Sequence, residues 1–225
     1  MSTEKKIKLF FKLLMELIIM TKEIKDFVKN YWKYYLRLEA EFIHTLKYVE
    51  FSKDNYKTYS LEYLWLYLAV CSEIDVMGKV FAKKQNPNFD GSKANIQKWW
   101  YEIQTVHTSN GLALNMQEVD FLDIESFKPW ENYAIERYNN RKGSICYKLS
   151  TSINAHTPFW WTQYNKVKHE RTQQKEEGGT NYNNANLKNL SRAFGALFIL
   201  ENTFLNEYTV KEDFSKIEES HLFSI

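Results

Sequence analysis

Residues 60–84 read SLEYLWLYLAVCSEIDVMGKVFAKK, and this segment indicates how the rest of the chain must be organised. Ser60 is a favourable helix N-cap, and Glu62 lies in the first turn, where an acidic side chain suits the helix dipole. The first half of the segment is apolar on nearly all sides. A helix of this kind is buried against several neighbours, so we expect residues 60–84 to form the central helix of the core.

Two acidic residues, Glu73 and Asp75, interrupt the apolar character of this helix near its middle. A buried carboxylate needs a partner, because burial of an unpaired charge is costly. The two residues therefore either reach the surface where the helix emerges, which is the favoured interpretation, or pair with basic groups.

Apolar residues recur at steps of three and four over most of the remaining chain, which is typical of amphipathic helices. Glycine and proline are scarce, with seven and three copies, which also favours long helices. Residues 4–50 are predicted to form one long helix or two in succession with a break near Thr21. The other predicted helices are residues 92–106, a helix that begins with residues 157–171 and ends at Gly178-Gly179 or earlier, and residues 184–208. The predicted packing residues of the 92–106 helix are Ile96, Trp99, Trp100, Ile103 and Val106.

The pattern changes between residues 112 and 150. Residues 134–138 and 144–150 flank a turn-forming NNRKG, and Ile145, Tyr147 and Leu149 alternate as in a β-strand. We therefore predict one mainly α-helical domain over residues 1–225, a helical bundle with a small irregular or β-hairpin insertion at 112–150 and a tail at 210–225 that either docks or stays loose.

Composition narrows the function classes. The net charge of +2 excludes a basic field over the whole molecule, so any contact with RNA must be local. Two cysteines cannot form a disulfide framework or a four-cysteine zinc site, and the five histidines show no metal-ligand spacing. We therefore expect neither a metal nor a cofactor.

The N-terminus, MSTEKKIKLFFKLLMELIIM, has a basic start and an apolar run. Lys12 and Glu16 interrupt that run and no small-residue cleavage site follows, so we favour an amphipathic helix of a cytoplasmic protein over a signal peptide. No window of roughly 20 apolar residues exists, which argues against a membrane protein.

Residues 157–171, TPFWWTQYNKVKHER, form a helix with two distinct faces. Thr157 suits the N-cap and Pro158 the first helical position. At about 100° per residue one face is apolar and the opposite one polar. The apolar face holds Trp160, Tyr164 and Val167, and the polar face holds Thr162, Asn165, Lys166 and His169. Periodicity alone leaves open whether the polar face is a site or plain solvated surface.

The segment YNKVKHER, between the helices that bear SEIDVMGKVF and NLSRAFGALFIL, resembles the HEPN superfamily of small all-α bacterial proteins. That family carries an arginine, a polar residue, three variable residues and a histidine on a late helix. Asn165 and His169 match the polar and histidine positions, and Tyr164 occupies the place of the arginine. The resemblance implies a HEPN-like bundle that forms a homodimer.

Many HEPN proteins are metal-independent endoribonucleases, some of them toxins or phage-defence effectors that an antitoxin or a neighbouring protein controls. By this resemblance His169 would be the acid–base catalyst, and Asn165 would hold a phosphate oxygen or the imidazole. A tyrosine carries no permanent charge, so Tyr164 would stack or pack. The candidate substitutes for the arginine are Lys166, Lys168 and Arg171, and the candidate base-stacking residue is Trp161, which we expect to be the exposed member of the Trp160-Trp161 pair.

Three functions remain open at this stage. The chain could be a HEPN-like ribonuclease, a non-catalytic HEPN-like module that binds RNA, nucleotide or protein, or an unrelated helical structural or interaction protein. Only the ribonuclease should lose its activity when His169 is replaced.

Overall fold

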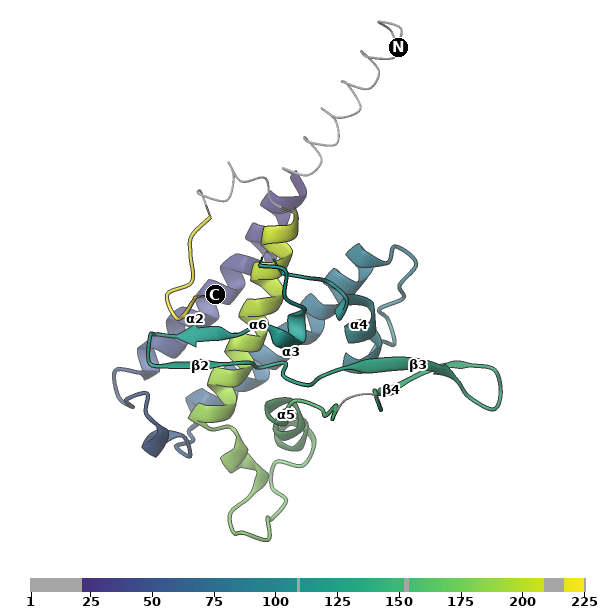
Figure 1. The fold of residues 1–225 in the computed structure, drawn as a ribbon. Helices are drawn as coiled ribbons and strands as arrows, with labels where there is room; N and C mark the ends of the chain where they lie inside the picture. Colours follow the sequence, from purple (N-terminus) through teal and green to yellow (C-terminus); the bar gives the residue numbers. More distant parts are fainter. Residues whose placement is uncertain (1–21, 109, 152–153, 209–216, 225) are drawn as a thin grey trace, which may run out of the picture.

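The central helix predicted from residues 60–84 is α3, Leu61–Gln85, in the computed structural model, which describes residues 22–108, 110–151, 154–208 and 217–224. The Ser60 hydroxyl accepts a hydrogen bond from the Tyr63 amide at 3.1 Å, which confirms the predicted N-cap. The helices α2 (Lys33–Thr45), α4 (Ile96–Ile103), α5 (Phe159–His169) and α6 (Leu187–Tyr208) all contact α3. Figure 1 shows α6 crossing in front of α3, with α5 below both. The protein is therefore mainly α-helical around a central helix.

The N-terminal helix is continuous over its described part. Residues 22–27 are helical and lead through a π-helical turn, η1 (Val28–Trp32), into α2. The predicted break near Thr21 and the amphipathic start of the chain lie outside the described residues. None of the helices in the described ranges combines the length and apolar character that a membrane span requires.

Helix α4 is shorter than predicted. Its N-cap is Asn95, whose side chain accepts from the Lys98 amide at 3.0 Å, whereas Ser92 lies in a turn that Asp90 stabilises. The predicted packing residues up to Ile103 are buried. Trp99 lies directly over Gly78 of α3, where an added Cβ would be only 2.5 Å from the indole ring.

Residues 112–150 contain η3 (Leu114–Met116) and four strands, which belong to two antiparallel sheets. β3 (Ile135–Asn139) and β4 (Ile145–Leu149) pair as the predicted hairpin. β1 (Val119–Phe121) lies between β2 (Glu125–Phe127) and β5 (Phe223–Ser224). This region is not peripheral, because it contributes fully buried rings to the core: Phe121, Trp130 and Tyr133.

The C-terminal tail docks on the core at its end. The buried carboxylate of Glu39 accepts hydrogen bonds from the amides of His221 at 2.9 Å and Leu222 at 3.3 Å, as well as from the Tyr35 hydroxyl at 2.8 Å. These bonds hold the chain where β5 joins β1.

Helix α5 begins one residue later than predicted. Pro158 occupies the N-cap position, so Thr157, the predicted cap, lies one residue before it. The helix ends at His169, and the chain then folds back through a turn in which Gln174 and Thr180 pair. Two short helical turns complete the fold: η2 (Lys53–Asn55) and η4 (Asn181–Asn184).

A pair of carboxyl groups lies between α3 and α6. Glu201 is fully buried and neither of its oxygens has a hydrogen-bond partner in the described structure. Burial raises the pKa of Glu201 well above its ordinary 4.5, and the nearby Glu73 raises it further. Glu73 was expected to reach the surface or pair with a basic group, and it reaches the surface in part. It is half-buried, forms no salt bridge in the described residues, and has its own pKa raised by burial.

We predict that Glu201→Gln stabilises the protein at high pH. The raised pKa keeps the folded-state carboxyl protonated, whereas the unfolded chain ionises above about 4.5. The stability of the wild type is therefore fully present below that pH and is lost as the pH rises toward the folded-state pKa. Glutamine mimics the protonated acid and does not ionise, so its advantage over the wild type should grow as the pH rises above 4.5, by at most about 1.4 kcal/mol per pH unit. Urea unfolding at pH 4.5 and pH 8 measures the difference in free energy of unfolding between the variant and the wild type. The exposed Glu207→Gln is the control, and an equal effect of Glu201→Gln at both pH values would contradict the prediction.

Candidate functional site

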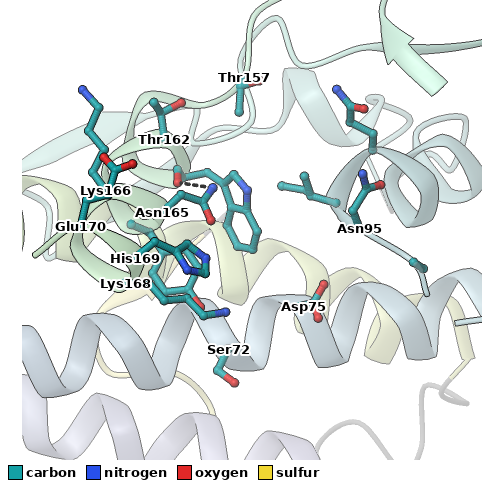
Figure 2. Close-up of a pocket in the computed structure, with 15 residues that line it drawn as sticks. Ser72, Asp75, Asn95, Thr157, Thr162, Asn165, Lys166, Lys168, His169 and Glu170 are labelled. Atoms are coloured by element: carbon teal, nitrogen blue, oxygen red, sulfur yellow. Dashed lines mark hydrogen bonds between the residues drawn. The ribbon is translucent and has the colours of Figure 1, made fainter. Parts of the chain in front are cut away.

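The polar face of α5 lines a cavity of about 790 Å³, which we call the His169 cavity. Its walls are α5, the middle of α3 and the start of α4, and Figure 2 shows Asn165 and His169 on one side with Asp75 and Asn95 across from them. The predicted site residues that line it are Trp161, Tyr164, Asn165, Lys166, Lys168 and His169. Arg171 is exposed beyond the end of α5 and does not line the cavity.

His169 and Asn165 lie one turn apart on the same side of α5, as the spacing predicts. The Asn165 amide Nδ2 donates to the carbonyl of Trp161 at 3.1 Å, which fixes the side chain and leaves its Oδ1 as an acceptor. His169 is exposed, and no described side chain forms a hydrogen bond with its ring. Both ring nitrogens are therefore available to a ligand.

The lysines of α5 are oriented differently from each other. The Lys168 ammonium lies 5.5 Å from the centre of the Tyr164 ring, on the side toward α3. It is close enough to Cys71 of α3 to lower the pKa of that thiol, although burial is the larger effect and raises it well above its usual value. Lys166 extends away from His169 in Figure 2. Both lysines are exposed and line the cavity, Lys168 beside the Tyr164 ring and Lys166 on the side away from His169.

Tyr164, at the position where a HEPN protein would carry an arginine, belongs to the core. It is only 5% exposed and packs edge-on against Tyr67 of α3, with ring centres 6.1 Å apart. Burial is the first cause that raises its pKa to about 12, and the nearby Cys71 and Asp75 add to it. Its hydroxyl is therefore neutral at physiological pH, and the ring forms the floor of the cavity.

Trp161 was expected to be the exposed tryptophan, and this expectation is wrong. It is 8% exposed and packs against Trp160 and Tyr164, with ring centres 5.7 Å and 5.1 Å away. A helical wheel gives only the direction of a side chain around its own helix, and here the neighbouring rings of Trp160 and Tyr164 pack against a position that would otherwise face water. The buried ring leaves little surface on which a base could stack.

Asp75 is a cavity residue that the sequence did not single out as functional. Its carboxylate accepts from the Trp99 indole Nε1 at 3.1 Å and forms a 2.5 Å salt bridge with Lys79. This is the pairing with a basic group that the sequence allowed as the second interpretation. Asp75 and Glu170 are the two acids that line the cavity, so a phosphate is best placed against the ammonium groups of Lys166 and Lys168 on α5. Asn95 and Ser72 also line the cavity, and the sequence pattern singled out neither of them.

No family model, curated protein or solved structure matches this chain. Within the described ranges, no group of three or more His, Cys, Asp or Glu side chains is arranged to hold a metal ion. Any chemistry assigned to the cavity must therefore be argued from its own residues.

We predict that Asp75 supports the wall of the cavity through Trp99. Asp75→Ala leaves the buried indole N–H without an acceptor and should lower the free energy of unfolding by about 1–3 kcal/mol. Asp75→Asn keeps an acceptor and loses only the partly exposed pair with Lys79, so it should cost clearly less. Urea unfolding followed by tryptophan fluorescence compares the two variants. Equal losses would show that the Trp99 hydrogen bond contributes nothing.

Proposed function

We propose that this protein is a HEPN-like, metal-independent endoribonuclease whose RNA substrate enters the His169 cavity. The observation that carries the proposal is the convergence of an unengaged imidazole, His169, with the amide of Asn165 and the ammonium of Lys168 in one cavity. An acid–base group beside a cation and a polar side chain is what cleavage of RNA without a metal requires.

In the proposed reaction, His169 takes the proton of a ribose 2′-hydroxyl. The 2′-oxygen then attacks the adjacent phosphorus, and the bond from phosphorus to the 5′-oxygen breaks. The His169 imidazolium formed in this way gives its proton to the leaving 5′-oxygen. The products are therefore a 2′,3′-cyclic phosphate and a 5′-hydroxyl. Lys168 stabilises the negative charge on the phosphorane, in place of the arginine that the family carries at position 164. The Asn165 Oδ1 can accept from a ribose hydroxyl or from the imidazole N–H.

A second candidate is a non-catalytic module that binds RNA or nucleotide in the same cavity. The specific observation in its favour is that no described side chain orients His169, whereas catalytic histidines are normally held by a second group. In this case His169 would contribute to binding alone.

We predict that purified protein cleaves RNA in the presence of EDTA and leaves 2′,3′-cyclic phosphate ends. His169→Ala should reduce the rate at least about 100-fold, because it removes the general acid–base group. The matched control is His44→Ala, which removes another exposed histidine, on α2. Cyclic phosphate ends are detected by mass spectrometry of the products. RNA binding without cleavage by a folded wild type would favour the non-catalytic module.

The proposal includes a homodimer that brings two α5 helices together. Helix α3 carries an exposed stripe of Leu61 (73% exposed), Trp65 (49%) and Val76 (41%), and Ser72 on the same stripe lines the His169 cavity. Spacings of four, seven and four residues place these side chains on one side of the helix. A second copy on this stripe would set two His169 cavities side by side, so that each could complete the other.

We therefore predict that Trp65→Glu disrupts the dimer, because a charge replaces an apolar contact at the interface. Light scattering after gel filtration should give a dimer for the wild type and a monomer for the variant, with RNA cleavage falling in parallel. Tyr48→Glu, at another exposed aromatic residue, is the control. A monomeric wild type that cleaves RNA would remove the dimer from the proposal.

A protein with this activity fits the role of a toxin or phage-defence effector in the cytoplasm. An antitoxin or neighbouring protein would then restrain it by covering the His169 cavity.

A further inference from the structure

A second cavity, of about 870 Å³, lies at the other end of α5. It is bounded by the 53–59 loop, the folded-back loop after α5 and the start of α6, and Phe159 at the beginning of α5 also lines it. Four lysines surround it, and we call it the lysine cavity. They are Lys53, Lys57, Lys175 and Lys188.

The lysine cavity has an excess of positive charge. Asp54 and Glu177 are its two acids. Lys175 is held by Asn184 Oδ1 at 3.2 Å and by the exposed Glu177 at 3.5 Å. The other three lysines form no salt bridge with any described residue. Lysine ammonium groups that are not neutralised locally attract polyanions such as the phosphates of a nucleic acid.

Free backbone amides at the start of a helix can bind an anion, but the amides at the start of α6 are already engaged. The amides of Leu187 and Lys188 donate to the carbonyls of Thr58 and Tyr56, at 2.9 Å and 3.2 Å, and the Asn189 amide donates to Asn186 Oδ1. Recognition must therefore come from side chains. One such group is Asn184, which is 8% exposed, lines the cavity and has no hydrogen-bond partner for its Nδ2.

Exposed aromatic rings border the same cavity. Phe159 is 65% exposed and Tyr59 is 45% exposed. A large apolar ring in water beside a cluster of lysines is the combination that single-stranded nucleic-acid binders use, with a base stacked on the ring and phosphates on the cations. A duplex offers no unstacked base to such a ring.

The exposed face of α5 connects the lysine cavity to the His169 cavity. Phe159, Thr162, Lys166 and His169 lie within about 80° of one another around the helix, over a length of about 15 Å. Lys166 stands between the two cavities, because it lines the His169 cavity and its charge also contributes to the lowered pKa of Glu177 in the lysine cavity. Helix α5 itself has no acid on this face, and the two acids along the path are Glu177, near Lys166, and Glu170, which lines the His169 cavity.

We propose that single-stranded RNA is bound along this face. Phosphates contact the lysine cavity, one base stacks on Phe159, and the strand passes Lys166 to reach His169. This inference rests on the proposed function, since it assigns the path by which the RNA substrate enters the His169 cavity.

The test measures binding separately from cleavage. The probe is a fluorescent single-stranded 2′-O-methyl oligoribonucleotide, which lacks the free 2′-hydroxyl that cleavage needs, and its duplex form is the comparison. Binding to the full chain is followed by anisotropy at several salt concentrations. We expect the wild type to bind the single strand more tightly than the duplex.

Two sets of variants test the contacts. The double variant Lys57→Ala, Lys188→Ala should weaken binding about tenfold or more. It should also reduce the slope of log binding constant against log salt concentration by roughly 1.4, at about 0.7 for each lost phosphate contact. The matched control, Arg141→Ala with Lys142→Ala, removes two charges from the β3–β4 turn. It should change neither the affinity for the oligonucleotide nor the dependence of that affinity on salt. Phe159→Leu should weaken binding about fivefold or more, whereas Phe159→Trp should retain it, because stacking needs an aromatic face.

The outcomes separate this inference from the proposed function. If the oligonucleotide binds equally to the lysine, phenylalanine and control variants, the path is overturned, while cleavage that depends on His169 would still support the ribonuclease. Absence of both binding and cleavage overturns both proposals. If polyglutamate binds the lysine cavity as tightly as the oligonucleotide and Phe159→Leu has no effect, the surface fits an acidic protein partner and the RNA path is overturned.

Discussion

The contact between Trp99 and α3 is the constraint on which the candidate site depends. The indole ring lies against Gly78, where any side chain would collide with it, and its N–H donates to Asp75 three residues earlier. One contact thus fixes both the distance between α3 and α4 and the rotation of α4. The start of α4 consequently forms a wall of the His169 cavity, and Asp75 becomes part of its lining.

A chain of tryptophans extends this constraint to α5. Trp100 stacks on Trp130 with ring centres 4.5 Å apart, and Trp130 contacts Trp160 of α5 edge-on at 5.1 Å. Their indole N–H groups donate to the carbonyls of Tyr133, Ala196 and Pro129, so these buried rings leave no N–H unpaired. Large rings with fixed hydrogen bonds make a rigid support, which is what a site on a short helix such as α5 needs.

Positive charge is concentrated in one region of the surface, although the net charge of the chain is small. Glu and Asp side chains nearly balance Lys and Arg overall, yet lysines collect around one end of α5 and Lys166 and Lys168 lie along it. Helix α5 therefore carries His169 at its C-terminal end and borders the cation-rich cavity at its N-terminal end.

The sequence by itself determined the features that depend on local periodicity. These include the central helix at 60–84, the β3–β4 hairpin and the polar face of α5 with Asn165 and His169 one turn apart. Only the tertiary structure decided which of these residues share a cavity. Three features could not be predicted: the place of Asp75 in one cavity, the place of the lysines of the 53–59 loop in the other, and the burial of Trp161. Each depends on contacts between segments far apart in the chain. Periodicity gives the direction of a side chain around its own helix, whereas packing alone determines what lies opposite it.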